Sequence, residues 1–350
     1  MQKSRLNSIS NRNSLLKKSL LALASIFFVC LVLIAVRVNG FYNTIHSDVE
    51  NQTSPKKQVE EKTEYTFLLL GYGGGTHEGT YLTDSIIVAH VNLKTKRAIL
   101  ISLPRDIWVK VPTTTGEDFH SKINALYQMG MFPNKYPSVD QSQVSEDNPS
   151  GILKKAVEDI TGLKIDSFAA IDFEGFVKAI DTLGGIDVNV EKSFTDYEYP
   201  LEEKMNDLCE RDEEFAQIEP IINKEMSAED QAKLFAEKPE LEQFYTDIKE
   251  NPTIAFPCRY EELSFVAGET EMDGITALKY ARSRHALADG GDFNRARRQQ
   301  NVIEAAKQKI LSIGFIPKII PLLNDLENHV KTDLPLAEMN KLLLEGRNAS

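Results

Sequence analysis

One uncharged apolar segment near the start of the chain limits what the chain can be. Residues 19–36 (SLLALASIFFVCLVLIAV) contain no charged side chain, and Arg37 follows them. Residues 1–18 contain five basic side chains and no acidic one. About 20 apolar residues cross a bilayer, so we expect a transmembrane helix over residues 19–38. A cleaved signal peptide is the alternative, although its apolar region usually has about 7–15 residues and ends at a small-residue cleavage site.

The flanking charges predict the orientation of this segment. Basic residues accumulate on the cytoplasmic side of a membrane helix, so residues 1–18 are expected to form a cytoplasmic tail. Everything after residue 38 is then extracytoplasmic, in a single-pass protein of the cell membrane. Residues 39–63 are polar and lack periodicity, and they predict a linker.

Charge and cysteine content exclude several function classes. The chain has 52 acidic and 40 basic side chains, a formal net charge of −12 and a pI near 5.1. Non-specific nucleic-acid binding needs broad positive charge, so we expect no nucleic-acid partner. Three cysteines are too few for a disulfide-dense scaffold or a four-cysteine zinc site. The six histidines form no HExxH motif.

From residue 64 onward, strand and helix signals alternate. Their spacing predicts an α/β sandwich around a mixed central sheet. This domain is expected over residues 64–312, followed by a C-terminal helical extension over 313–350. The short turn at 95–97 predicts that the strands on either side form an antiparallel hairpin. The predicted strands are 66–71, 84–93, 98–104, one starting at 168, and 186–191; the predicted helices are 151–162, 173–183, 274–284 and 293–312.

Residues 201–262 interrupt the alternation. They are rich in Glu, Asp and Lys and contain helical fragments, so we interpret them as an insertion in this domain, with a separate domain as the alternative. Cys209 and Cys258 lie near its two ends. Outside the cytoplasm these cysteines could form a disulfide that closes the base of the insertion. Two unpaired cysteines are the alternative.

A cluster of basic side chains stands out from the acidic background. Residues 279–298 hold six basic and two acidic side chains. On a helix, Arg295, Arg298 and Gln299 share one face, and Arg297 points away from it. The arginine fork matches phosphate oxygens, so this face predicts phosphate or pyrophosphate binding. A solvated helix with ion pairs is the alternative.

Three other places give weaker signals. The glycine-rich loop 71–85 could bring backbone N–H groups to an anion, but it is neither a Walker loop nor a full dinucleotide fingerprint. Asp84 opens the second predicted strand, either as a turn cap or as a Mg²⁺ ligand beside a phosphate. Arg105 in SLPRD and Lys122 in SKINALY are, taken alone, ordinary surface residues.

Together the motifs resemble those of the LytR-CpsA-Psr family of bacterial envelope proteins. They run in the order TDSIIVA, SLPRD, SKINALY, DFEGFVKAIDTLGGIDVNV, MDGITALKYARSRH and DFNRARRQQ. The resemblance covers residues 65–312 apart from the insertion, and it implies a membrane anchor and an external three-layer α/β/α domain. It also implies a phosphotransferase that moves a glycopolymer from an undecaprenyl-pyrophosphate carrier to a peptidoglycan sugar hydroxyl. The implied partners are the polyprenyl-pyrophosphate-linked glycopolymer, peptidoglycan and the membrane.

The resemblance assigns roles to matching residues. Asp84 would hold Mg²⁺ (or Mn²⁺), and it or a nearby carboxylate would accept the proton of the attacking hydroxyl. The arginines would neutralise the pyrophosphate and the departing prenyl phosphate. The expected catalytic residues are Asp84, Arg105, Arg284 and Arg295; the expected pyrophosphate-binding residues are Lys122, Arg282 and Gln299, with Arg298 added from the helical face.

Two positions depart from the family pattern. Members usually have an acid shortly after the first strand (LLLG-x-D) as a second magnesium ligand, where this chain has Tyr72 in a triple-glycine loop. They also usually have an arginine just before the Asp-Ser or Asp-Thr pair, where Leu82 and Thr83 stand. Glu78 in the glycine-rich loop is the candidate substitute for the missing metal ligand.

Two other functions stay open at this point. A prenyl-pyrophosphate hydrolase would use the same arginines with water as the acceptor. A non-catalytic envelope module would bind pyrophosphate lipids without turning them over, and the missing acid near Tyr72 favours it.

Overall fold

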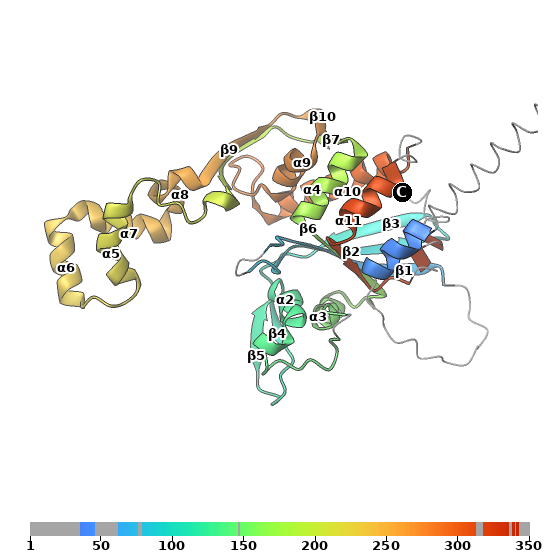
Figure 1. Ribbon diagram of the computed structural model, residues 1–350, viewed down its shortest axis with the longest axis horizontal. Coiled ribbons are helices and arrows are strands. Elements are labelled where there is room, and N and C mark those ends of the chain that lie inside the picture. Colours follow the sequence, from blue (N-terminus) through green and yellow to red (C-terminus); the bar gives the residue numbers. More distant parts are fainter. Residues whose placement is uncertain are drawn as a thin grey trace, which may run out of the picture. The chain divides into compact units, whose positions relative to one another are not determined.

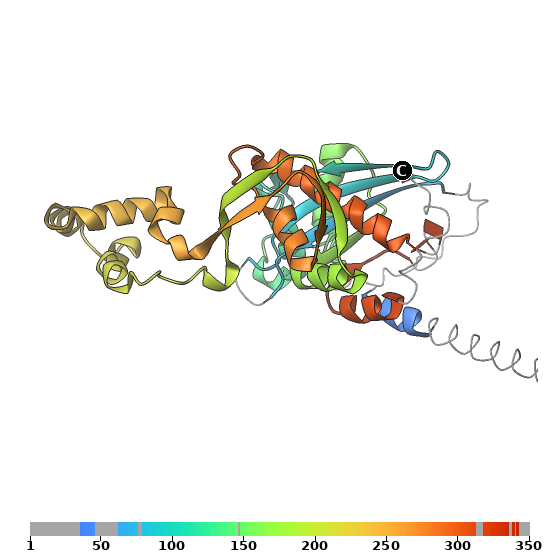
Figure 2. The same cartoon turned by 90° about the horizontal axis from the view of Figure 1, so that it is seen from above.

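A computed structural model describes residues 36–45, 62–75, 79–145, 148–312, 318–335, 338–339 and 341–342. The chain divides into two compact units. The first comprises Met1–Ile186 and Ala306–Ser350, and the second comprises Asp187–Ala305. Figures 1 and 2 show the arrangement of the elements in each unit.

A five-stranded mixed sheet is the centre of the first unit, as the sequence predicted. Its strand order is β11-β6-β1-β2-β3. β1 is antiparallel to β2 and parallel to β6, and β2 and β3 form the expected antiparallel hairpin. The strands are β1 (Glu64–Tyr72), β2 (Thr83–Asn92), β3 (Arg97–Ser102), β6 (Ser167–Asp172) and β11 (Val330–Thr332).

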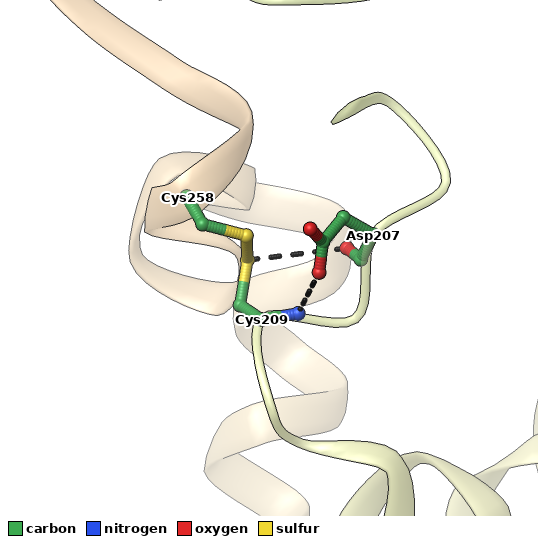
Figure 3. Close-up of side chains that lie close together, drawn as sticks. All are labelled: Asp207, Cys209 and Cys258. Atoms are coloured by element: carbon green, nitrogen blue, oxygen red, sulfur yellow. Dashed lines mark hydrogen bonds between the residues drawn. A yellow bond between two sulfur atoms is a disulfide. The ribbon is translucent and has the colours of Figure 1, made fainter. Parts of the chain in front are cut away.

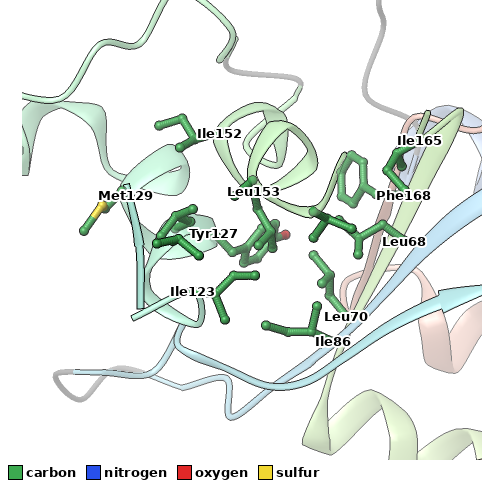
Figure 4. Close-up of a cluster of buried hydrophobic side chains, with 14 of the residues drawn as sticks. Leu68, Leu70, Ile86, Ile123, Tyr127, Met129, Ile152, Leu153, Ile165 and Phe168 are labelled. Atoms are coloured by element: carbon green, nitrogen blue, oxygen red, sulfur yellow. The ribbon is translucent and has the colours of Figure 1, made fainter. Parts of the chain in front are cut away.

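Two helices cover one face of this sheet. Alternate residues of β1, such as Leu68 and Leu70, are buried against α2 (Ala125–Met131) and α3 (Gly151–Thr161). Helix α3 contributes Ile152 and Leu153 to the same core, and Figure 4 shows Leu153 on the side of the strand residues. The period of two in the strand and the amphipathic spacing in the helix therefore bury one common set of apolar side chains.

Two further helices of the first unit lie on the opposite side of the sheet (Figure 1). They are α4 (Phe173–Leu183) and α11 (Ile319–Leu326), which pack against each other. Asp172 caps α4 by accepting a hydrogen bond from Gly175 N at 2.7 Å, and Gly184 ends the helix at φ 79°. A hairpin of β4 (Trp108–Val111) and β5 (Phe119–Lys122) and a short 3₁₀ turn, η1 (Pro133–Lys135), complete the unit.

Both ends of the first unit differ from the expectation. The C-terminal segment expected to be helical contains β11, which pairs antiparallel with β6. Residues 36–45 are helical, so helix extends beyond residue 38, where we expected the linker to begin. Phe41 and Ile45, one turn apart on this helix, are both buried, so the helix has an apolar face that it packs against the protein. Arg37 donates to Asn324 of α11, and both Arg37 and Thr44 donate to Glu327, the residue that follows α11.

Most of the expected transmembrane segment, residues 19–35, lies outside the described residues. No helix in the described part of the chain is both long enough and apolar enough to span a membrane.

The second unit contains two two-stranded ribbons, helix α9 (Gly274–Arg282), most of helix α10 (Gly291–Ile310) and the helices of the insertion. β7 (Ile186–Val190) pairs with β10 (Gly268–Met272), and β8 (Phe194–Pro200) pairs antiparallel with β9 (Tyr260–Phe265). Helix α9 carries the YARSRH motif at its end. Helix α10 carries the DFNRARRQQ motif at its start.

The insertion is a helical subdomain at the end of the β8–β9 ribbon (Figure 2). It has its own core, which includes Ile218, Leu241 and Phe244. Cys209 and Cys258 form the expected disulfide with a Cα–Cα distance of 5.6 Å, and Figure 3 shows it beside Asp207. The helices are α5 (Asp212–Ile222), α6 (Ala228–Glu237), α7 (Pro239–Glu250) and α8 (Pro252–Ala255), with 3₁₀ turns η2 (Glu202–Lys204) and η3 (Pro257–Arg259).

Candidate functional site

Asp84 occupies an irregular position in β2. Gly71 of β1 pairs with Ser85, and the next residue, Tyr72, pairs with Thr83, so Asp84 is the extra residue of a β-bulge. A bulge redirects one side chain out of the alternating pattern of a strand. The Asp84 carboxylate is about a quarter exposed and forms an ion pair with Arg105 Nη1. The sequence predicted both residues, but not the bulge that brings them together.

Charges of alternating sign extend this ion pair. The Arg105 guanidinium also lies 3.6 Å from the Asp106 carboxylate, which forms an ion pair with Lys122. Within the described part of the chain, buried Arg105 Nε makes no hydrogen bond. Nε is the Arg105 atom that lies 3.6 Å from Asp106, so this contact is an ion pair that is too long to be a hydrogen bond.

Asn124 joins the three motifs that contain these residues. Its carbonyl accepts hydrogen bonds from Thr83 N at 3.1 Å and from Thr83 Oγ1 at 3.3 Å. Its own N–H donates to the Arg105 carbonyl at 3.2 Å. The asparagine of SKINALY therefore links TDSIIVA to SLPRD. No sequence pattern indicates this role of Asn124, because it depends on backbone hydrogen bonds between distant segments.

Tyr72 does not supply a metal ligand. Its ring is almost fully buried and stacks on Tyr81, with 5.4 Å between the ring centroids, and lies 5.6 Å from the Tyr127 ring. Burial, with a smaller contribution from Asp172, raises the pKa of the Tyr72 phenol far above its ordinary value. The phenol therefore stays protonated. Glu78, the proposed substitute, lies outside the described residues.

In the second unit, a buried carboxylate organises the YARSRH motif. Asp196 on β8 is fully buried and accepts hydrogen bonds from Ser283 Oγ at 2.6 Å, Arg284 N at 2.9 Å and His285 N at 3.1 Å. Burial opposes the charge of Asp196, but these bonds and one from Glu198 N outweigh it and hold the pKa of this carboxyl below its ordinary value. Asp196 fixes the backbone that carries Arg284, and no sequence motif predicted this role.

Arg284 presents an accessible guanidinium. Its Nε donates a hydrogen bond to His285 Nε2 at 2.9 Å. Within the described part of the chain, its two Nη atoms have no hydrogen-bond or ion-pair partner. The neighbouring Arg282 is engaged differently: it donates to Glu202 at 2.5 Å and to Tyr199 Oη at 3.3 Å. The first of the paired arginines thus contacts the base of the insertion.

The structure corrects the interpretation of Arg298 as a pyrophosphate ligand. Its side chain is 2 % exposed, so a substrate phosphate has no access to it. It donates to the carbonyls of Tyr280 and Ser283 and to both the carbonyl and the carboxylate of Asp289. Gln299 Nε2 lies 3.4 Å from the Ala281 carbonyl. These residues satisfy carbonyl groups around the end of α9, which have no partner inside the helix.

The remaining helix positions follow the predicted faces. Arg295 is on the same face as Arg298 and is also buried, with Nη2 2.9 Å from the Asp292 carboxylate. Arg297 is about half exposed and lies 3.3 Å from Glu191. The shared face was predicted correctly, but it points into the unit rather than toward solvent. A direct contact of Arg295 with substrate stays a prediction.

The Asp84 carboxylate is the kind of oxygen ligand that Mg²⁺ prefers, but it is a single carboxylate. Its ion pair with Arg105 engages one carboxylate oxygen, Oδ1. Mg²⁺ often binds through one or two carboxylates together with substrate phosphates, so a single carboxylate is compatible with it. Among the described residues, the one group of three possible metal ligands is Asp207, Cys209 and Cys258. Two of these form the disulfide, so that group lacks the thiolates a metal would need.

The fold and the site thus define an α/β protein with a mixed central sheet, whose arginines are held by carboxylates and backbone carbonyls. The model described as the LytR_cpsA_psr family matches residues 33–349. The chain belongs to this family.

Similar proteins carry two kinds of name. The chain is 24% identical over 335 residues to Biofilm regulatory protein A of Streptococcus mutans, covering 92% of this chain and 64% of that protein. It therefore spans less than two thirds of that relative's length. It is also 24% identical over 308 residues to the polyisoprenyl-teichoic acid–peptidoglycan teichoic acid transferase TagU of Enterococcus faecalis, covering 87% and 73%.

A solved structure shows the same fold. Protein gbs0355 from Streptococcus agalactiae matches with a TM-score of 0.50 and 20% sequence identity. The match covers 82% of this chain and 74% of that chain.

Proposed function

We propose that this protein is a membrane-anchored extracytoplasmic phosphotransferase that moves a glycopolymer from an undecaprenyl-pyrophosphate carrier to peptidoglycan. The relative from Enterococcus faecalis is named a teichoic acid–peptidoglycan transferase, and membership of the same family supports a related activity. The proposed partners are the polyprenyl-pyrophosphate-linked glycopolymer, peptidoglycan and the membrane. The proposal includes a three-layer α/β/α domain and a transmembrane helix over residues 19–38.

The observation that best supports the proposal is the arrangement of Arg284. Buried Asp196 holds the backbone of Arg284, and the Nη atoms of Arg284 are left without a partner among the described residues. A charged fork that is rigidly held and unpaired is suited to an anion with two oxygens on one side, such as a phosphate. By contrast, the arginines that serve the fold, such as Arg298, have their donors occupied.

The proposed chemistry is phosphoryl transfer. The hydroxyl oxygen of a peptidoglycan sugar attacks the phosphorus that bears the glycopolymer, and the bond from this phosphorus to the prenyl phosphate breaks. Arg284 would stabilise the charge that develops during this step, and the family resemblance assigns the same role to Arg105. Asp84 or the neighbouring Asp106 would take the proton of the hydroxyl group. Lys122 would contribute further positive charge beside Asp106.

Mg²⁺ (or Mn²⁺) is part of the proposal, with Asp84 as its ligand among the described residues. When bound, the ion would polarise a phosphoryl oxygen as a Lewis acid. Localisation is also proposed: an N-terminal tail in the cytoplasm, a single membrane pass and an extracytoplasmic catalytic domain. The Cys209–Cys258 disulfide supports this placement, because disulfides persist mainly in oxidising compartments.

The test compares two arginines that carry the same charge. Arg284→Lys keeps the charge but loses the bidentate fork, and Arg297→Ala removes an exposed charge that pairs with Glu191. A charge-assisted contact contributes roughly 1.5–3 kcal/mol, so Arg284→Lys should slow transfer about 10- to 150-fold. Arg297→Ala should transfer at close to the wild-type rate. The assay follows a lipid-linked glycan onto a peptidoglycan fragment, with and without a chelator.

The products of this assay separate the alternatives. A hydrolase would release prenyl phosphate without labelling the peptidoglycan fragment. A non-catalytic module would bind the lipid and yield no product. Equal transfer rates for the wild type and both variants would contradict the phosphotransferase proposal.

A further inference from the structure

We infer that His285 is a positioning residue, which orients Arg284 so that a phosphate is held by the two terminal guanidinium nitrogens. The inference rests on the proposed function, because it concerns the grip on the pyrophosphate. It assigns roles to His285, the last residue of YARSRH, and to Glu198 of β8, neither of which was a predicted site residue.

The contacts of His285 define its tautomer. Its Nε2 lies 2.9 Å from Arg284 Nε, and its Nδ1 lies 3.1 Å from Glu198 Oε2. A guanidinium nitrogen can only donate, so Nε2 must be the acceptor, and the proton of a neutral imidazole is then on Nδ1. Nδ1–H donates toward the Glu198 carboxylate. Glu198 therefore favours the one tautomer that can hold Arg284.

The backbone beneath this contact is also fixed. Asp196 accepts the N–H groups of both Arg284 and His285, at 2.9 and 3.1 Å. Asp196 and Glu198 both belong to β8. This one strand therefore holds the backbone of Arg284 and His285 through Asp196, and the imidazole of His285 through Glu198. The arginine is thus restrained at its Cα and again at its Nε.

This restraint determines which edge of the guanidinium is available. An arginine can grip two oxygens through Nε and one Nη, or through both Nη atoms. His285 occupies Nε–H, so the end-on edge formed by Nη1 and Nη2 remains for the phosphate. A side chain that is ordered before binding loses less conformational entropy when the ligand arrives. Loss of the His285 acceptor should therefore weaken binding although it removes no contact with the ligand.

The experiment measures the affinity of the full-length protein for geranylgeranyl pyrophosphate by calorimetry. His285→Phe keeps a flat ring but has no acceptor, and we expect about 10-fold weaker binding. His285→Gln keeps an acceptor at a similar reach, and we expect affinity within about twofold of the wild type. A purely structural role would not distinguish them in this order, because Phe resembles the ring more closely than Gln does. Thermal unfolding of each variant checks the fold.

A double variant tests the coupling. In an Arg284→Ala background, His285→Phe should cause no further loss, because the residue that it positions is gone. A full additional loss would overturn the inference, and so would wild-type affinity in His285→Phe or equal weakening in His285→Gln. Unchanged binding in Arg284→Ala would instead contradict the proposed function. Loss of binding in Arg284→Ala with wild-type affinity in His285→Phe would overturn the positioning role alone.

Discussion

At the scale of single residues, Arg297 and Arg298 are neighbours in one motif with different roles. Arg298→Met would leave Asp289 and the carbonyls of Tyr280 and Ser283 without their buried partner. Breaking a buried charge pair costs about 3–5 kcal/mol, so we expect the free energy of unfolding to fall by that amount. Arg297→Ala, on the exposed side, should change it by less than about 0.5 kcal/mol. Urea denaturation provides the measurement, and a small effect of Arg298→Met would mean that its hydrogen bonds contribute little.

Asp196 should make the free energy of unfolding depend on pH in the acidic range. Its pKa is lower in the folded protein than in the unfolded chain, so its contribution is complete above the unfolded value, about pH 4. That contribution is lost as the pH falls through the lower, folded value. Asp196→Asn should cost about 1–3 kcal/mol at pH 7 through unsatisfied donors. The difference from the wild type should shrink below pH 4, as unfolding measurements at pH 7, 5 and 3 would show. A constant difference would mean that the Asp196 charge has no part in stability.

At the scale of elements, the insertion should depend on its disulfide. The two cysteines are 49 residues apart, and closing a loop of about that length reduces the entropy of the unfolded chain by an equivalent of about 4 kcal/mol. In Cys209→Ser/Cys258→Ser, hydrogen exchange should become faster in α5 and α7, while exchange in β1 and β2 stays unchanged. Equal exchange in the insertion with and without the disulfide would show that its apolar core is sufficient.

The elements that the sequence predicted well are those whose signals are local. The hairpin of β2 and β3 follows from alternation and a short turn, and α3 and α4 end at Gly162 and Gly184 within a residue of the predicted positions. The three-residue β11 has too short a pattern to identify, and it exists because β6 offers an open edge. The candidate site likewise has features that are local and features that depend on tertiary contacts. Residue types and helix faces could be predicted, but the bulge at Asp84 and the burial of Arg298 depend on tertiary contacts.

At the scale of the whole molecule, the N-terminal helix changes how the proposed anchor joins the catalytic part. Residues 36–38 belong both to the expected span and to the helix over residues 36–45. That helix is attached to the first unit by buried Phe41 and Ile45, by the Arg37–Glu327 ion pair and by Thr44 Oγ1, which lies 3.3 Å from Glu327 Oε1. A flexible linker of 25 residues is therefore replaced by a docked helix and the shorter segment that follows it.

This docking gives the last prediction. Arg37→Glu places two carboxylates together at α11, so the helix should detach and its amides over residues 39–45 should exchange several-fold faster. Arg37→Glu combined with Glu327→Arg restores opposite charges and should slow exchange again. Arg97→Glu, an exposed substitution on β3 that makes the same change in net charge, is the control and should have no effect on residues 39–45. Hydrogen exchange of the full chain in lipid nanodiscs provides the measurement. Equal exchange in all four proteins would show that the ion pair does not hold the helix, and failure of the swapped pair alone would assign the attachment to Asn324, which also bonds Arg37.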